Sequence, residues 1–482
     1  MAKQPMLRFV DVARDMPVKR PPDLRRGDFR EIYGEYAAEK AGVQAGRCSQ
    51  CGVPYCQSHC PLHNNIPDWL RLTAEGRLRE AYETAQLTNT FPEICGRICP
   101  QDRLCEGNCV IEQSGHGTVT IGSIEKYVTD AAWEEGWVEP IAPRAERAES
   151  VGIVGGGPGG LAAADMLRRA GVQVTVYDRH DRAGGLMTYG IPGFKLEKEV
   201  VMRRVRQLEE GGVRFRLECE VGRDVSFAAL REAHDAVLIA TGVYKTRDLQ
   251  APGSGAAGVV DAIDFLTTSN RKSFGDDVPL FEDGTMSARG KRVVVIGGGD
   301  TAMDCVRTSV RQGATSVKCL YRRDRANMPG SQREVANAEE EGVEFVWLTA
   351  PRAFLGGDRV TGVRVERMRL GAPDATGRQR PETIPGADYD EPADMVVLAL
   401  GFEPEDLPAL WDEPDLQVTR WGTVKADFRT HETAMEGVYA VGDIVRGASL
   451  VVWAIRDGRE AAATMLERFA ARDSAGAGIA AE

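Results

Sequence analysis

Apolar residues recur at helical spacing along the first part of the chain. In residues 64–89, NNIPDWLRLTAEGRLREAYETAQLTN, this pattern follows Asn65, a typical capping residue, and includes Pro67, which suits a first helical turn. Residues 122–135, GSIEKYVTDAAWEE, have the same pattern. These segments predict a mostly helical domain over residues 1–145.

The pattern changes near residue 140. A polar, proline-containing linker, residues 138–150, precedes a short apolar run, Val151 to Val154, that enters a glycine-rich turn. A helical pattern follows, and then the strand-like segment 172–178, VQVTVYD. The order of strand, glycine turn, helix and strand recurs over residues 291–324. This order predicts an α/β fold with two Rossmann-like dinucleotide-binding domains behind the helical one.

The first glycine turn has the parts of a dinucleotide site in the expected order. Gly155, Gly157 and Gly160 match G-x-G-x-x-G, and Asp178 ends the next strand. The glycines permit the tight turn, the approach of a pyrophosphate and close packing of helix on strand. The helix N-terminus then faces the phosphates, and Asp178 is placed to accept the ribose hydroxyls.

The second turn has the pattern G-x-G-x-x-A, formed by Gly297, Gly298, Gly299 and Ala302. The strand that follows ends in Arg322 and Arg323 instead of an acid. A carboxylate there would repel a 2′-phosphate, whereas guanidinium groups bind it bidentately. The second site therefore favours NADPH over NADH, with a solvated arginine face as the alternative.

Two dinucleotide folds in one chain indicate a flavin in one and a nicotinamide in the other. Three further apolar runs end in turns of the same kind: Ala240-Thr241-Gly242, Ala399-Leu400-Gly401 and Gly442-Asp443. Asp443 precedes a helix that would direct its N-terminal dipole toward a flavin. An ordinary turn residue is the alternative interpretation of Asp443.

Eight of the eleven cysteines lie in two short runs, C-x2-C-x4-C-x3-C-P at 48–61 and C-x3-C-P-x4-C-x3-C at 95–109. Structural zinc sites use separated pairs, and stable disulfides are rare in the cytosol. Dense cysteines followed by proline are typical of iron–sulfur ferredoxins, where four thiolates hold one [4Fe–4S] cubane. We therefore predict two [4Fe–4S] clusters, with zinc and disulfides as alternatives, held by Cys48, Cys51, Cys56, Cys60, Cys95, Cys99, Cys105 and Cys109.

Charge and length limit the class of protein. The chain has 482 residues and a formal net charge of −12, which disfavours nucleic acid as a partner. It contains no apolar run of eighteen residues, and its first twenty residues are charged throughout, without the apolar core of a secretory signal. We expect a cytoplasmic protein with no membrane partner.

The order of these motifs resembles the small (β) subunits of bacterial NADPH-dependent glutamate synthases. The resemblance extends to about residue 470 and is carried by the two cysteine runs, GGGPGGLAAA at 155–164, GGGDTAMDC at 297–305 and AVGDIVRGASLVVWA at 440–454. The same module resembles the N-terminal third of dihydropyrimidine dehydrogenase and the large subunit of an electron-bifurcating ferredoxin–NADP oxidoreductase. The fold implied is of the pyridine nucleotide-disulfide and adrenodoxin reductase type.

The resemblance implies further contacts to each cofactor. FAD would be held, besides the residues above, by Gly185, Leu186, Lys195, Ser449 and Val451. NADPH would contact Asp300, Thr301, Ala399, Leu400 and Gly401. One cluster would use Cys48, Cys51, Cys56 and Cys109, and the other Cys60, Cys99, Cys105 and either Cys95 or Glu125. In dihydropyrimidine dehydrogenase a glutamine ligand stands at the position of Glu125, so the glutamate here departs from that pattern.

The resemblance also implies the reaction and a partner. NADPH would reduce FAD, and [4Fe–4S] clusters would carry single electrons to a large α subunit with FMN. That subunit would convert glutamine and 2-oxoglutarate to two glutamates, making the assembly a hetero-oligomer. No general acid or base is required for the hydride step. The alternative is another NADPH-linked flavin and iron–sulfur subunit of ferredoxin-NADP or pyrimidine-reducing type.

The expected domain plan is discontinuous. Residues 1–145 form the helical iron–sulfur domain, and residues 146–288 begin the FAD domain. The NADPH domain, residues 289–407, is inserted, and residues 408–471 complete the FAD domain. Residues 472–482, which are small and polar, are expected to form a disordered tail.

Overall fold

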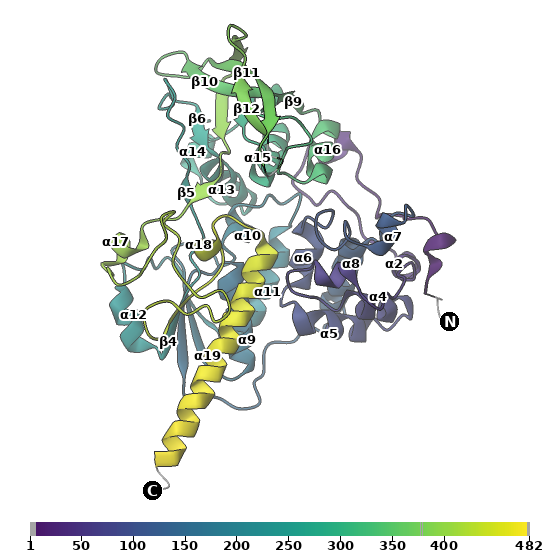
Figure 1. Cartoon of the computed structure of the whole chain (residues 1–482), viewed down its shortest axis with the longest axis vertical. Coiled ribbons are helices and arrows are strands. Elements are labelled where there is room, and N and C mark those ends of the chain that lie inside the picture. Colours follow the sequence, from purple (N-terminus) through teal and green to yellow (C-terminus); the bar gives the residue numbers. More distant parts are fainter. Residues whose placement is uncertain (1–5, 376, 378, 480–482) are drawn as a thin grey trace.

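The computed structural model describes residues 6–375, 377 and 379–479 and divides into three bodies (Figure 1). The first, on the right of Figure 1, consists of helices, and each of the others is built around a parallel sheet. The predicted α/β class and the predicted helical first part are confirmed. None of the described helices combines the length and the apolar character that a membrane span requires.

The helical body packs around Trp69, Leu70 and Ile124, which are almost fully buried. The pattern of residues 64–89 forms two helices instead of one, because the chain turns at Gly76 with a positive φ of 76°. A 3-10 turn at Arg8–Val10 precedes the helices α1 (Pro22–Arg25), α2 (Ala38–Ala45), α3 (Tyr55–Ser58), α4 (Ile66–Ala74), α5 (Leu78–Thr88), α6 (Pro92–Ile98), α7 (Val110–Gln113) and α8 (Ile121–Glu134).

The first sheet has the parallel order β16-β4-β1-β2-β3. Val154, the last residue of β1, pairs with Tyr177 of β2 and Ile239 of β4, so the turns after these three strands meet at one edge. The strands are β1 (Ser150–Val154), β2 (Gln173–Tyr177), β3 (Arg214–Arg216), β4 (Ala236–Ile239) and β16 (Val438–Ala440). The helices of this body are α9 (Pro158–Arg169), α10 (Leu186–Tyr189), α11 (Lys198–Glu210), α12 (Phe227–Ala233), α17 (Leu407–Trp411), α18 (Asp443–Arg446) and α19 (Val451–Ile479).

The second sheet repeats this plan in the parallel order β6-β14-β7-β8-β9. Ile296 of β7 pairs with Leu320 of β8 and Leu398 of β14, which again brings three turns to one edge. The strands are β6 (Val259–Asp261), β7 (Arg292–Ile296), β8 (Ser316–Tyr321), β9 (Glu344–Trp347) and β14 (Met395–Leu398). Its helices are α13 (Ala262–Ser273), α14 (Pro279–Glu282), α15 (Asp300–Arg311) and α16 (Gln332–Glu340).

The pairing of the second sheet does not agree with the expected domain boundary at residue 288. Strand β6 lies about thirty residues before that boundary, yet it pairs with β14 of the second sheet. The chain crosses between the two sheets twice, and the crossing segments pair as β5 (Lys245–Thr246) and β15 (Phe402–Glu403). The chain therefore enters the second sheet soon after β5.

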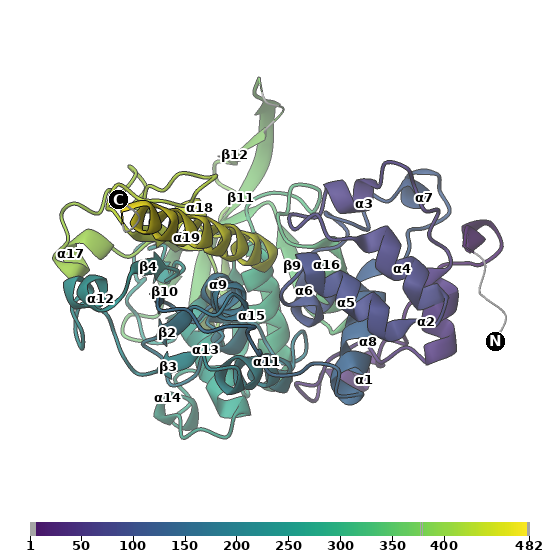
Figure 2. The ribbon, with the colours of Figure 1, turned by 90° about the horizontal axis from the view of Figure 1, so that it is seen from below.

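An antiparallel unit extends from the second sheet. Strands β10 (Thr349–Leu355), β11 (Gly362–Pro373), β12 (Gln379–Thr383) and β13 (Tyr389–Pro392) form it, and the β11–β12 end projects from the body in Figure 2. No such unit was predicted from the sequence. It lies in the chain between β9 and β14.

The expected disorder of the tail is wrong for residues 472–479. Helix α19 continues to Ile479, and Arg147 pairs with Asp473 at 3.1 Å. Alanine has the highest helix propensity, so the alanines after residue 470 continue a helix that is already nucleated. Residues 480–482 of the predicted tail lie outside the described residues.

The crossing of α9 and α19 depends on glycine at position 458. A Cβ atom added there would lie 2.1 Å from the carbonyl oxygen of Gly159, in the first turn of α9. We expect Gly458→Ala to cost about 1–3 kcal/mol through overpacking and to lower the melting temperature in calorimetry. Gly255→Ala is the control, because a Cβ there meets nothing within 4 Å. Equal melting temperatures for both variants would contradict the expectation.

Candidate functional site

The first glycine turn leaves space for a phosphate. Gly155 has φ of 107°, and a Cβ there would lie 2.4 Å from the Ala240 carbonyl oxygen. A Cβ on Gly160 would lie 2.1 Å from the Gly155 carbonyl oxygen, whereas one on Gly157 would meet nothing within 4 Å. Gly157 also precedes the first turn of α9. The open position therefore faces an unobstructed helix N-terminus, as a pyrophosphate requires.

A cavity of about 390 Å³ extends from this turn. Most of the residues predicted to contact FAD line it: Gly155, Gly157, Asp178, Gly185, Leu186, Thr241, Gly242, Gly442, Asp443, Ser449 and Val451. The hydroxyl of Thr241 is buried there without a hydrogen-bond partner among the described residues. A buried polar atom of this kind, beside an open glycine turn, fits a polar ligand such as a dinucleotide. We call this space the dinucleotide cavity.

Asp178 and Asp443 have different surroundings in the dinucleotide cavity. Asp178 accepts hydrogen bonds from the backbone N–H groups of Gly156, at 2.7 Å, and His180, at 2.9 Å. It therefore also holds the glycine turn. Asp443 accepts from the backbone N–H of Ser449 at 3.1 Å and from its hydroxyl at 2.7 Å, while burial raises the pKa of Asp443.

Sequence reasoning missed part of the cavity wall. Tyr244 and Trp411 line it, and Arg179 lies over the Tyr244 ring at 4.9 Å. Tyr244 follows the predicted Gly242 by two residues, so the motif itself was the available signal. Gly160 does not line the cavity, because it packs against the glycine turn.

A second cavity, of about 230 Å³, lies where the three bodies meet, and we call it the junction cavity. It shares Leu186, Ser449, Leu450 and Val451 with the dinucleotide cavity. The body of the second sheet contributes Asp300 and Thr301, and the helical body contributes Cys99 and Pro100. Lys195 lines this cavity instead of the first and pairs with Asp304 at 2.9 Å.

The second glycine turn has the geometry of the first. A Cβ on Gly297, whose φ is 154°, would lie 2.3 Å from the Ala399 carbonyl oxygen, and one on Gly299 would meet nothing within 4 Å. A Cβ on Gly298 would meet the Tyr321 ring at 2.3 Å. Ala302 is buried beneath the turn. Phosphate space is thus present at this edge as well.

The residues around the second turn lie where strands β8 and β14 end. Arg322 and Arg323 directly follow β8, and Arg322 is exposed. Leu400 packs against the core, and Gly401 has φ of 97° with open space around it. Asp300 begins α15 and accepts a hydrogen bond from the backbone N–H of Ser331 at 3.0 Å. The structure therefore gathers the residues predicted to contact NADPH at one sheet edge.

The eight clustered cysteines are all unpaired and fall into two groups. Cys48, Cys51, Cys56 and Cys109 line one small cavity, which brings the last cysteine of the second run beside three of the first. Burial raises the pKa of Cys48 to about 11 and that of Cys56 to about 12. Four sulfur donors around one space fit an iron–sulfur cluster.

The second group contains Cys60, Cys95, Cys99 and Cys105. Burial raises the pKa of Cys60 to about 12, and the charges of Cys95 and Glu125 act in the same direction. Burial also raises the pKa of Cys105, where Glu106, Cys60 and Glu125 contribute. Cys95 and Cys99 act on each other, and Cys60, Cys105 and Glu125 act on Cys99, so the four thiols and the Glu125 carboxylate lie near one another.

Glu125, in α8, is 7% exposed. Its Oε1 accepts hydrogen bonds from Asn64 at 3.0 Å and from Asn89 at 3.1 Å, and burial raises the pKa of Glu125 to about 8. Cys95 contacts the same Asn89, at 3.7 Å from Sγ to Oδ1. Both candidate fourth donors are therefore buried beside the second cysteine group.

Comparison with known proteins identifies the family. The chain is 64% identical over 482 residues to the glutamate synthase [NADPH] small chain of Azospirillum brasilense, with 100% of both chains covered. The chain belongs to the glutamate synthase [NADPH] small chain family. A putative small chain from Cereibacter sphaeroides is 66% identical and covers 98% of each chain. The small chain of Escherichia coli K12 is 46% identical and covers 95% of this chain and 98% of its own. The predicted resemblance is confirmed.

The family models agree with the order of the bodies. Residues 25–137 match the model described as dihydropyrimidine dehydrogenase domain II, 4Fe-4S cluster. Residues 149–458 match pyridine nucleotide-disulphide oxidoreductase. The fold of FprA from Mycobacterium tuberculosis, solved in complex with NADPH, is similar, with a TM-score of 0.58 at 22% identity over 68% of this chain and 86% of that one. The prediction of an oxidoreductase with an iron–sulfur domain in front is confirmed.

Proposed function

We propose that this chain is the NADPH-oxidising subunit of a glutamate synthase. Electrons from NADPH pass through FAD and two [4Fe–4S] clusters to a large, FMN-containing α subunit that makes two glutamates from glutamine and 2-oxoglutarate. The lining of the junction cavity carries this proposal, because Leu450 and Val451, Asp300 and Thr301, and Cys99 and Pro100 all border one space. Flavin, nicotinamide and cluster must come within electron-transfer reach of one another for this chemistry.

Each cofactor has a distinct set of residues in this proposal. The dinucleotide cavity holds FAD, the second glycine turn with Arg322 and Arg323 holds NADPH, and the two cysteine groups hold the clusters. When bound, the flavin links the two-electron chemistry of NADPH to the one-electron chemistry of the clusters. The FAD domain then comprises two segments, with the NADPH domain inserted between β5 and β15.

The chain's own residues position and shield these groups. Gly157 and Gly299 leave the helix N-termini of α9 and α15 open to phosphates. Met16, Ile32 and Tyr33 of the amino-terminal segment line the junction cavity and limit the access of water to it. The protein acts in the cytoplasm, where the cysteines stay available for iron.

Co-purification tests the partner. A tagged chain produced together with the large subunit encoded in the same cell should elute with it and support NADPH-dependent glutamate formation. The isolated chain should contain FAD, iron and acid-labile sulfide. Retention of these cofactors with efficient transfer to ferredoxin or to a pyrimidine-reducing partner, and none to the large subunit, would contradict the proposed role.

The arginines after β8 should set the choice of nicotinamide. We expect Arg322→Gln to raise the KM for NADPH about tenfold to a hundredfold and to change the KM for NADH little, since bidentate charged contacts contribute about 1.5–3 kcal/mol. Steady-state reduction of a dye measures both constants. Arg352→Gln, which removes an exposed arginine of the same body in β10, is the control. Equal losses with NADPH and NADH would contradict recognition of the 2′-phosphate.

The fourth donor of the second cysteine group is open to test. If Glu125 is a ligand, Glu125→Ala should change the spectrum and the reduction potential of one cluster, whereas Cys95→Ala should leave both clusters in place. Iron analysis and electron paramagnetic resonance measure these changes. Unchanged spectra and potentials in Glu125→Ala would exclude Glu125 as a ligand and assign the position to Cys95.

A further inference from the structure

Arg333, in α16 of the nucleotide-binding body, reaches across to the loop that carries Cys99 and Cys105. Its Nη2 donates to the side-chain oxygen of Gln101 at 2.7 Å and lies 3.5 Å from the Cys99 carbonyl oxygen. Its Nε is buried without a partner among the described residues. Arg333 also lines the junction cavity together with Cys99. A cation from one body is therefore held against the cysteine loop of another.

Gln101 connects this cation to the rest of the loop. Its side-chain N–H group donates to the Cys95 carbonyl oxygen at 3.1 Å and to the Gly96 carbonyl oxygen at 3.2 Å. Its backbone carbonyl accepts from Glu106 at 2.9 Å and from Gly107 at 3.0 Å. Gln101 is 2% exposed. The contact of Arg333 thus reaches the segment that spaces Cys95, Cys99 and Cys105.

Arg333 remains charged in this position. Burial lowers the pKa of Arg333, but the nearby carboxylates Glu106, Glu334 and Asp102 outweigh it and raise the pKa overall. An arginine is protonated at any working pH. Its field is also only partly screened, because low dielectric surroundings strengthen charge interactions.

We propose that Arg333 is a positioning residue through which the nucleotide-binding domain raises the reduction potential of the cluster held by Cys60, Cys99 and Cys105. A reduced cluster carries one more negative charge than an oxidised one, so a fixed cation beside its ligands favours reduction. Because Arg333 belongs to the nucleotide-binding domain, it has this effect only while that domain is docked. In that state the cluster accepts an electron more readily across the junction cavity. The inference rests on the proposed function, because it requires the clusters to be present.

The contact between the two domains also includes Asp300, which lies beside the second glycine turn. Ser331, two residues before Arg333, donates its backbone N–H to Asp300 at the start of α15 and its hydroxyl to Asp102 at 3.3 Å. Arg103 of the helical body approaches Asp300 at 3.4 Å and donates to the Pro329 carbonyl oxygen at 2.7 Å. The loop that leads into α16, and so to Arg333, is therefore fixed between the second glycine turn and the cysteine loop.

The test is a redox titration of the whole chain, followed by electron paramagnetic resonance. At a fixed potential, Arg333→Gln should lower the reduced-to-oxidised ratio of one cluster about tenfold, which is about 59 mV for one electron. The cluster of Cys48, Cys51, Cys56 and Cys109 should not shift. Arg333→Lys, which keeps the charge, should stay near the wild type. Arg325→Gln, which removes an exposed arginine paired with Glu339 of α16, should leave both potentials unchanged.

Several results would overturn the role of Arg333. An unshifted potential in Arg333→Gln with intact iron content would do so, as would equal shifts in Arg333→Gln and Arg333→Lys. If Arg333→Gln loses iron, Arg333→Lys decides: a wild-type potential supports the proposal and a lowered one contradicts it. Absence of iron and acid-labile sulfide from the wild-type chain would instead contradict the proposed function.

Discussion

Replacing Cys99 by serine is expected to stop electron delivery to the large subunit while NADPH still reduces the flavin. Cys99 is the cysteine that lines the junction cavity among the described residues, beside Leu450 and Val451. It follows α6 and donates its backbone N–H to the Cys95 carbonyl oxygen at 3.2 Å. The second cysteine group is therefore the nearer one to the flavin region, and its cluster is expected to receive electrons first.

The expected loss is large. Mutation of a residue that only supports a metal ligand lowers activity about 10–100-fold. Loss of a ligand itself should therefore lower the rate of glutamate formation by at least about a hundredfold. NADPH-dependent reduction of a small dye that takes electrons from the flavin should remain within about twofold of the wild type. Both rates are measured on the same preparation, which separates the cluster from the flavin.

Cys51→Ser is the matched control, because Cys51 belongs to the first cysteine group. It should also stop glutamate formation, but NADPH should still reduce the cluster of the second group. In Cys99→Ser, NADPH should reduce neither cluster at a catalytic rate. The reverse result, with the remaining cluster reduced rapidly in Cys99→Ser and not in Cys51→Ser, would invert the order of the two groups.

The local chemistry of this site could be predicted from sequence because it depends on short patterns. The glycines at 155 and 297 are needed where a Cβ would collide with a neighbouring strand's carbonyl, and such turns have a fixed residue pattern. The dense cysteine runs likewise reflect the need for several sulfur donors close together. Asp178 lies beside the first glycine turn because α9 has the length that returns the chain to β2, and Asp178 directly follows β2.

Contacts between distant segments could not be predicted in this way. Strand β6 pairs with β14, which lies more than a hundred residues away, and nothing in either segment specifies its partner. Lys195 meets Asp304, and Arg333 meets Gln101, only because the three bodies dock. Neither pair has a local motif. The helix over residues 472–479 has another cause, because these residues continue a helix that is already formed by the preceding part of α19.

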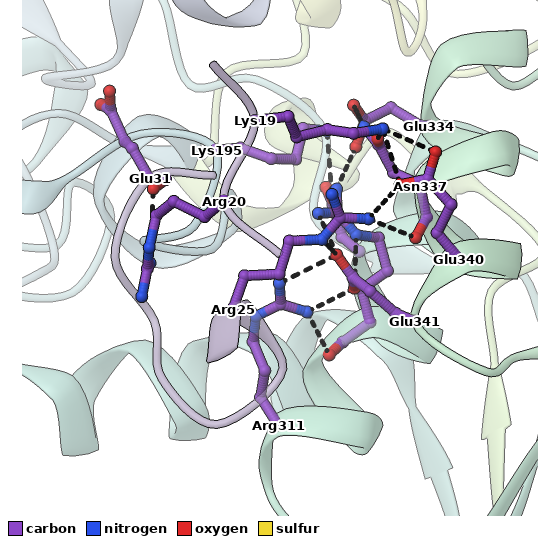
Figure 3. A network of polar contacts seen from close by, with 12 residues as sticks. Lys19, Arg20, Arg25, Glu31, Lys195, Arg311, Glu334, Asn337, Glu340 and Glu341 are labelled. Carbon is purple, nitrogen blue, oxygen red and sulfur yellow. Dashed lines mark hydrogen bonds and ion pairs between the residues drawn. The ribbon is translucent and has the colours of Figure 1, made fainter. Parts of the chain in front are cut away.

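Removal of the Glu341 carboxylate is expected to destabilise the docked domains more than any surface change. Glu341 is fully buried and accepts hydrogen bonds from Arg25 at 2.9 Å and Arg311 at 2.6 Å (Figure 3). It also accepts one from Arg307 at 2.8 Å. Arg25 comes from α1 of the helical body, and the other two from α15. The guanidinium groups of Arg307 and Arg311 also lie over Phe194, at 4.4 Å and 3.9 Å from its ring. One carboxylate thus neutralises cations from two bodies.

We expect Glu341→Gln to cost about 3–5 kcal/mol, because breaking a buried ion pair leaves uncompensated buried charge. Calorimetry and urea denaturation of the purified chain measure the loss. Glu339→Gln is the matched control, since Glu339 makes an exposed pair with Arg325 worth about 0–1 kcal/mol. A loss for Glu341→Gln as small as that of the control would mean that the arginines find water or other partners.

Acid should reproduce the effect of the substitution. Burial raises the pKa of Glu341, but hydrogen bonds from Arg311 and Arg307 outweigh it and lower the pKa to about 2, from an ordinary value of 4.5. The stability that the carboxylate contributes is therefore complete above about pH 4.5 and is lost as the pH falls toward 2. In Glu341→Gln this part of the acid dependence should disappear. The difference in unfolding free energy between the wild type and Glu341→Gln should thus narrow as the pH falls below 4.5, because protonation leaves both proteins without a negative charge at position 341.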